Sequence, residues 1–301
     1  MGLPRFLLIL TAALIALMLL LVWFVPPDDD FRTGNPSWNG SQSICAHSKA
    51  IPVDSLANLP GSPQRSTLIL IPYLDFTPAE LDTVYHFVTH GGRLILADDY
   101  GYGNRILEHL GLAARFSGQS LLDPILHYKN KWLPRITRFY PGTVTSGIDS
   151  IVLNHATTID HIETGAAIAL SSSFSFLDRN GNSIREDDEP TGPLPVISRH
   201  YLGSGQIFLI ADPSIFINSM EAVADNNIFL QTITGTTVSG LYIDQSHLPP
   251  SNLYRMKSLL AHTRDFFTSP VITIELILMV LLLTLSPIWY KPANRFWKGD
   301  K

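Results

Sequence analysis

The sequence predicts an α/β domain between two transmembrane helices, in which helices flank a mostly parallel sheet. Apolar runs occupy both ends of the 301-residue chain, and short β-rich segments alternate with helical segments between them. Such alternation is typical of parallel sheets covered by helices. The two apolar runs predict the membrane helices.

The first apolar run, residues 6–25, contains no charged residue. A helix rises about 1.5 Å per residue, so about 20 residues cross a hydrocarbon core of about 30 Å. A cleaved signal peptide is the alternative, but the sequence that follows, Pro26-Pro27-Asp28-Asp29-Asp30, offers no small-x-small cleavage site. We therefore predict an uncleaved transmembrane anchor in residues 1–27.

The second apolar run, residues 271–290, predicts a transmembrane helix and a short basic tail in residues 269–301. Basic residues flank both runs on their outer sides: Arg5, and then Lys291, Arg295, Lys298 and Lys301. Because cytoplasmic flanks carry an excess of Lys and Arg, we expect a two-pass protein of the plasma membrane with both termini cytoplasmic. Residues 28–268 then form an extracytoplasmic domain with 16 basic and 24 acidic residues, a net charge of −8 (16 − 24).

The clearest β-α-β unit of this domain begins at Ser66. A continuous apolar strand in residues 66–72 is followed by Thr77 and Glu80, which have the spacing of a capping box at a helix start. Gly91-Gly92 ends that helix, and the next strand is predicted in residues 93–97. A further strand is expected at residues 206–211, and residues 121–164 and 166–176 predict a β-rich insertion.

Composition excludes several classes of protein. A formal net charge of −5 and the lack of a basic stripe argue against a nucleic-acid binder. One cysteine, Cys45, excludes a disulfide framework and a multi-cysteine metal site, and no G-x-S-x-G elbow is present. His86 and His90 stand four residues apart on the predicted helix, but without a third ligand we interpret them as part of a solvated face. We predict no catalytic residues.

Residues 178–189 resemble a calcium loop, whose pattern is D-x-[DN]-x-[DN]-G-x5-E. The ligands would be the side chains of five residues and the backbone carbonyl of a sixth: Asp178, Asn180, Asn182, Ile184 (carbonyl), Glu186 and Glu189. Ser183 departs from the pattern, because it stands where glycine normally makes the sharp turn. A structural Ca²⁺ site is one interpretation, and a solvated acidic turn is the other.

Acidic residues and glycines also follow two predicted strands. Their positions at the carboxyl end of the sheet, where α/β proteins bind ligands, predict a ligand edge made of Asp98, Asp99, Gly101, Gly103 and Asp212. It is not a dinucleotide fingerprint, because Ile106 stands in place of the third glycine. Helix capping and turn formation are the alternative role of these residues.

Four phrases together resemble one prokaryotic, largely archaeal, two-span membrane family, domain-of-unknown-function family four-three-five-zero. They are NPSWNGSQS (residues 35–43), FTPAELDTVYHFVTHGGRLILADDYGYGN (76–104), FLDRNGNSIREDDEPTGP (176–193) and GQIFLIADPSIFINSM (205–220). The resemblance implies an outer domain of the class I glutamine-amidotransferase type, and MoxR-type AAA+ ATPases or von Willebrand-type proteins as partners. A glutaminase needs a cysteine on a strand-to-helix elbow, and this chain has none after Cys45.

Two hypotheses about function follow. The first is a non-catalytic, membrane-anchored binding or scaffold protein, accessory to an envelope complex. The second is an extracytoplasmic hydrolase or small-ligand sensor that uses the acidic strand edge. Exposed aromatic patches on the outer domain would favour the first. A deep pocket that contains Asp98, Asp99 and Asp212 would favour the second.

Overall fold

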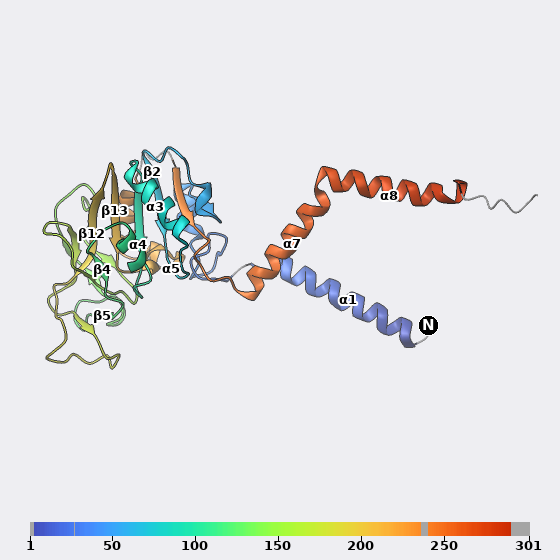
Figure 1. Ribbon diagram of the computed structural model, residues 1–301. Helices are drawn as coiled ribbons and strands as arrows, with labels where there is room; N and C mark the ends of the chain where they lie inside the picture. The colour runs from blue at the N-terminus through green and yellow to red at the C-terminus, as the bar shows by residue number, and fades with distance from the viewer. Residues whose placement is uncertain (1–2, 27, 236–239, 290–301) are drawn as a thin grey trace, which may run out of the picture. The chain divides into compact units, whose positions relative to one another are not determined.

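The computed structural model describes residues 3–26, 28–235 and 240–289 of the chain (Figure 1). The chain divides into two compact units, one of residues 26–249 and one of residues 1–25 and 250–301. Tyr290 and the basic tail that follows it lie outside the described residues.

The larger unit is built on one mixed sheet of eight strands. In spatial order these strands are β1 (Ile51–Val53), β14 (Gly240–Asp244), β2 (Ser66–Leu70), β3 (Arg93–Ala97), β13 (Gly205–Ile210), β12 (Pro195–Leu202), β10 (Ala167–Leu170) and β7 (Arg138–Phe139). The first five are parallel to one another. Every residue of β2 is buried, as is typical of a strand with helices on both faces of its sheet.

The prediction of a mostly parallel sheet is correct only for those five strands, because β12, β10 and β7 pair in antiparallel fashion. The cause is a tight hairpin between β12 and β13. Leu202 pairs with Gly205 across Gly203 and Ser204, and Gly203 takes a positive φ of 57°. A connection of two residues can join only antiparallel strands.

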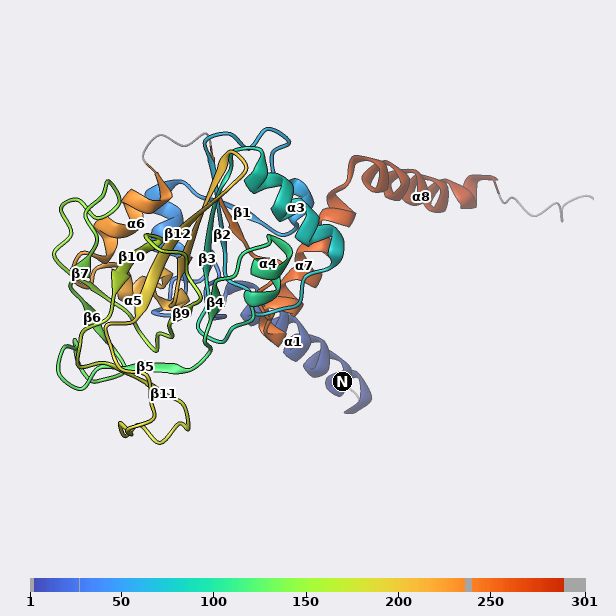
Figure 2. The same cartoon turned by 60° about the vertical axis from the view of Figure 1, so that its left-hand side comes forward.

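Helices cover both faces of the sheet. Figure 2 shows α3 (Pro78–Thr89) and α4 (Asn104–His109) on one face, and α5 (Asn218–Glu221) and α6 (Asn226–Thr234) on the other. The chain moves from β2 through α3 to β3, and returns from β13 through α6 to β14 in the opposite direction. Right-handed crossovers in opposite directions place their helices on opposite faces. The remaining short helices are α2 (Gln42–Ser48), η1 (Leu56–Asn58) and η2 (Pro213–Phe216).

The predicted start and end of α3 are confirmed. The Thr77 hydroxyl accepts the Glu80 backbone N–H, and the Glu80 carboxylate accepts the Thr77 backbone N–H at 2.8 Å, which completes the capping box. Gly91, with a φ of 99°, follows the helix. Leu81, Val84, Phe87 and Val88 form its buried face.

Between β3 and β12 the chain forms short strands outside the parallel core. They pair as three two-stranded sheets: β4 (Arg115–Phe116) with β9 (Ile159–Asp160), β5 (Ser120–Leu122) with β11 (Phe176–Asp178), and β6 (Arg135–Ile136) with β8 (Ile151–Val152). Asn226 anchors this segment to α6, because its amide oxygen accepts the Val152 N–H and its amide nitrogen donates to the Val152 carbonyl.

The smaller unit consists of helices. α1 (Leu3–Phe24) is long and apolar enough to cross a membrane, with a mean hydropathy of 2.9 in its most apolar window. α7 (Asn252–Thr268) and α8 (Pro270–Trp289) meet at a bend of 62°, and together they meet the same length and apolarity criteria as one broken span. One helix near the N-terminus that could span a membrane therefore agrees with the sequence prediction.

Candidate functional site

The predicted acidic edge forms at the carboxyl ends of β3 and β13. These two strands are parallel neighbours in which Ala97 pairs with Ile210, so the residues after both strands emerge at the same edge of the sheet. Asp98 and Asp99 follow β3, and Asp212 follows β13. The structure thus brings the three predicted carboxylates together.

The carboxylate of Asp98 closes the turn that follows β3. It accepts backbone N–H groups from Tyr100 at 2.9 Å, Gly101 at 3.1 Å and Gly103 at 2.6 Å. Gly101 has a φ of 88°, a conformation that favours glycine. Asp98 is buried, and burial raises its pKa against the opposing effect of these donors. Asp98 and the two glycines therefore build the turn.

Asp212 is fully buried and caps the short helix η2. One oxygen accepts the Ser214 N–H at 2.7 Å, and the other accepts the Asn154 N–H at 2.7 Å. Burial raises the pKa of Asp212 to about 8, although both backbone donors oppose the change. The nearby charge of Asp99 adds to the increase. This carboxyl group joins the inserted segment to the sheet edge.

Asp99 differs from its two neighbours. Its Oδ1 atom is buried and has no hydrogen-bond partner among the residues that the structure describes. Burial, followed by the charge of Asp98, raises the pKa of Asp99 to about 7. Within the described residues, no Lys, Arg or His forms an ion pair with Asp98, Asp99 or Asp212. Asp99 therefore keeps one acceptor oxygen that no donor of the described chain satisfies.

Three tyrosines surround this edge, and the sequence analysis identified none of them as site residues. The rings of Tyr100 and Tyr102 stack with centroids 5.6 Å apart, and each meets Tyr73 edge-on, at 6.1 and 6.2 Å. Tyr100 is 61% exposed and Tyr102 is 55% exposed. The pKa of Tyr73 is raised, mainly by burial and then by the charge of Asp99. The tyrosines therefore lie close enough to the carboxylates to feel their charge.

The same edge lies where the chain enters and leaves this unit. Phe31, just after the start of the unit, stacks on Tyr73 at 5.6 Å. The Arg32 guanidinium donates to the carbonyls of Gln245 at 2.6 Å and Leu248 at 2.8 Å, close to the end of the unit. Phe31 and Arg32 thus lie a few residues after α1, and Leu248 lies a few residues before α7, along the chain.

A buried histidine also stands at this edge and was missed from the sequence. His247 follows β14, and its Nδ1 lies 2.7 Å from an Asp244 oxygen, while its ring stacks on Phe76 at 3.5 Å. Its backbone carbonyl accepts the N–H groups of Tyr73 and Leu74. His247 therefore fixes the position of the segment that carries Tyr73. The Asp244-x-x-His247 spacing was the only sequence signal for this contact.

The predicted calcium residues lie together in one loop after β11. Asp178 is buried and accepts the N–H groups of Gly181 and Ser183, and Glu189 accepts those of Arg179 and Glu186. Ser183 has a φ of 61°, so it adopts the left-handed turn for which glycine is usual at this position.

The other predicted ligands contact one another within this loop. The Asn180 and Asn182 amide nitrogens donate to the two oxygens of Glu186, at 2.7 and 3.0 Å. Ile184 donates its N–H to the Asn182 side-chain oxygen. Within the described residues, no group of three or more His, Cys, Asp or Glu side chains is arranged to hold a metal ion.

Residues 34–234 match the model of a family described as Domain of unknown function (DUF4350). The chain belongs to this family. The matched range of the DUF4350 domain begins after Arg32 and ends with α6, so it includes Asp98, Asp99 and Asp212. No curated protein matches the chain.

Several solved structures match the chain at low sequence identity. The mmIFT52 N-terminal domain is 13% identical, with a TM-score of 0.49, over 70% of this chain and 96% of that one. A β-galactosidase from Bacillus circulans sp. alkalophilus is 16% identical, with a TM-score of 0.33, over 50% of this chain and 21% of that one. A cytoplasmic protein, STM1381, from Salmonella typhimurium LT2 is 12% identical, with a TM-score of 0.31, over 55% and 63%. Such distant likeness is no argument for function.

Proposed function

We propose that this DUF4350 protein is a non-catalytic, membrane-anchored binding protein whose acidic edge receives a basic side chain of a partner. The observation that carries the proposal is Asp99. Its Oδ1 atom is buried and finds no hydrogen-bond partner in the described part of the chain, beside the exposed stacked pair Tyr100 and Tyr102. A buried acceptor without a donor costs free energy that a bound donor recovers.

The chemistry of the edge favours a cation as the bound group. Aromatic ring faces attract cations, and a Lys or Arg side chain can donate to a carboxylate beneath them. Because burial raises the pKa of Asp99 to about 7, a cation that binds there displaces a proton at neutral pH. The loop between the apolar runs carries a net charge of −8 (16 − 24), which attracts basic partners over a longer range.

Other features argue against catalysis as the main role. Asp98 and Asp212 use their oxygens to accept backbone N–H groups, which fits the capping role considered from the sequence. Cys45 lies in α2, and its Sγ contacts the Ala50 carbonyl at 3.1 Å, so it is no elbow nucleophile. A hydrolase or ligand sensor built on the same edge is the second candidate, since Asp99 also suits proton transfer near pH 7.

The membrane arrangement is part of the proposal. α1 anchors the protein in the plasma membrane, α8 forms the second span, and residues 28–268 are extracytoplasmic. Basic residues outside both apolar runs support cytoplasmic termini. The parallel strands at the centre of the sheet are compatible with the glutamine-amidotransferase-like fold that the family resemblance implies. MoxR-type AAA+ ATPases and von Willebrand-type proteins are the partner classes that the family resemblance suggests.

We also infer that residues 178–189 hold a structural Ca²⁺ ion. The left-handed backbone at Ser183 and the convergence of Asp178, Glu186 and Glu189 in one loop support this role. An amide or carboxylate oxygen has two lone pairs, so an oxygen that accepts a backbone N–H can still bind a cation. Asn180, Asn182 and the Ile184 carbonyl would complete an oxygen-rich set of the kind that Ca²⁺ prefers.

A cross-linked pull-down from the native membrane tests the binding function. Full-length protein is compared with the variants Asp99→Asn, Tyr100→Ala and Tyr102→Ala, and captured proteins are identified by mass spectrometry. Tyr140→Ala is the matched control, because Tyr140 is 54% exposed but lies after β7 in the inserted segment. We expect a partner that is captured by the wild type and the control and lost from the three edge variants. Equal capture by all variants would contradict the proposal.

A further inference from the structure

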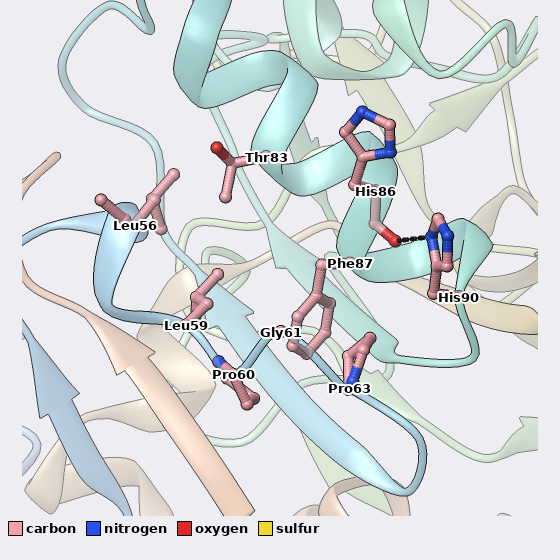
Figure 3. Close-up of a pocket in the computed structure, with 10 residues that line it drawn as sticks. Leu56, Leu59, Pro60, Gly61, Pro63, Thr83, His86, Phe87 and His90 are labelled. Carbon is pink, nitrogen blue, oxygen red and sulfur yellow. Dashed lines mark hydrogen bonds between the residues drawn. The ribbon is translucent and has the colours of Figure 1, made fainter.

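A cavity of about 330 Å³ lies between α3 and residues 56–63, away from the acidic edge. Its walls on one side are Leu56, Leu59, Pro60 and Pro63. On the other side α3 contributes Thr83, His86 and Phe87, and His90 follows directly after the helix. Figure 3 shows the Phe87 ring between this helix and the proline-rich segment, with both histidines on the helix side. The cavity is within the size range of small-ligand sites.

His86 lies in the last turn of α3, and His90 is the residue that directly follows the helix. Their ring centroids are 5.8 Å apart, and both side chains are exposed to solvent. Two imidazoles four residues apart on a helix are neighbours on its surface and can bind one metal ion together. Solvent exposure leaves the His86 ring free to rotate toward an ion bound at His90.

The hydrogen bond of His90 prepares it as a ligand. Its Nδ1 lies 2.8 Å from the His86 backbone carbonyl oxygen, drawn as the dashed line in Figure 3. A carbonyl oxygen can only accept, so Nδ1 carries the proton and Nε2 carries the free lone pair. Metal-binding histidines commonly donate their second nitrogen to a backbone carbonyl in this way. The His86 ring makes no hydrogen bond with the part of the chain that the structure describes, so its nitrogens are available as well.

We propose that His86 and His90 form a two-imidazole site for a divalent transition-metal ion at the mouth of this cavity. Imidazole suits Cu²⁺, Ni²⁺ and Zn²⁺, and the affinity is greatest for Cu²⁺ in the general order of divalent ions. Two protein ligands leave coordination positions open, and the adjoining cavity offers an apolar space for a ligand that completes them. This site is separate from the acidic edge and does not depend on the proposed binding function.

Calorimetric titration of the full-length protein in detergent tests the site, with Cu²⁺, Ni²⁺ and Zn²⁺ chloride as the probes. The protein carries no polyhistidine tag, which would bind the same ions. We expect one ion per chain. The single variants His86→Ala and His90→Ala should weaken binding by about 100-fold, since each removes the intramolecular second contact. His161→Ala is the control, because His161 is exposed but has no neighbouring histidine on a helix, and it should leave the affinity unchanged.

Electron paramagnetic resonance of the Cu²⁺ complex distinguishes this site from other metal-binding groups. We expect hyperfine structure from two imidazole nitrogens in the wild type and from one in each single variant. Circular dichroism melting should show an unchanged fold, since both histidines are exposed to solvent. Unchanged affinity in both single variants, or a spectrum without nitrogen coupling, would overturn the proposal.

Discussion

The carboxylate of Asp98 accepts the backbone N–H of Gly103 at 2.6 Å and thereby closes the turn between β3 and α4. A side chain added at Gly103 would place its Cβ 3.2 Å from this carboxylate and 3.3 Å from Leu96, so the turn is tightly packed. The adjacent Asp99 is held in place by this turn. Asp98 therefore builds the turn that positions the unsatisfied oxygen of Asp99.

Removing the Asp98 carboxylate should destabilise the unit of residues 26–249. Asp98→Ala leaves the N–H groups of Tyr100, Gly101 and Gly103 without their acceptor, and we expect a loss of about 3 kcal/mol in the free energy of unfolding. Chemical denaturation followed by tryptophan fluorescence measures this loss. The control is Asp75→Ala, which removes a carboxylate that is 98% exposed, and its effect should stay within about 0.5 kcal/mol.

Asp99 should make the stability of the fold depend on pH. Its pKa is about 7 in the folded state and about 4 in an unfolded chain, so between these values the folded state binds more protons. Stability therefore decreases as pH rises from about 4 to about 7, by up to about 1.4 kcal/mol per pH unit for one proton. Asp212 contributes in the same direction up to a pH of about 8.

The variant Asp99→Asn isolates this contribution, because an amide of the same shape cannot ionise. We expect the variant to resemble the wild type near pH 4 and to be more stable than the wild type at pH 8. Unfolding curves recorded at intervals of half a pH unit measure the difference. Parallel pH profiles of the two proteins would mean that Asp99 is already ionised in the folded state at low pH. The pKa of Asp99 would then not be raised by its burial at this edge.

The sequence predicted the local parts of the fold well. The capping box of Thr77 and Glu80 and the glycine after α3 are local patterns, and both lie where they were expected. The mixed character of the sheet was missed, although Gly203-Ser204 is a hairpin signal, because the flanking β12 was not recognised as a strand. The position of β14 between β1 and β2 depends on pairing across most of the chain, and no local pattern specifies it.

The candidate site was predictable to the same extent. Asp98, Asp99 and Asp212 follow neighbouring parallel strands, so their meeting at one edge follows from strand order. Tyr73 and His247 belong to the edge because β14 lies next to β2, which the sequence analysis did not foresee. The available oxygen of Asp99 depends on the side-chain geometry of the whole turn, which only a three-dimensional structure provides.

The proposed calcium site in residues 178–189 should be stabilised by Ca²⁺. We expect millimolar Ca²⁺ to raise the melting temperature of the wild type, and we expect no such increase in the double variant Asp178→Ala with Glu189→Ala. Each protein is compared with and without Ca²⁺, since both carboxylates also accept backbone N–H groups and their loss lowers stability by itself. Mg²⁺ at equal concentration is the ion control, because its octahedral geometry suits this loop less well. A wild type that melts at the same temperature in both conditions would exclude the site.

The membrane topology can be tested with the single native cysteine removed. In a Cys45→Ala background, the proposal predicts that a membrane-impermeant maleimide labels Phe174→Cys on intact cells, because residue 174 is 55% exposed in the outer domain. Gly2→Cys and Gly299→Cys should be labelled only after the membrane is permeabilised, since basic residues flank both apolar runs on the cytoplasmic side. Labelling of Gly299→Cys on intact cells, with Gly2→Cys protected, would show that α8 does not return the chain to the cytoplasm. The protein would then have one span, formed by α1, and the outer domain would extend to the C-terminus.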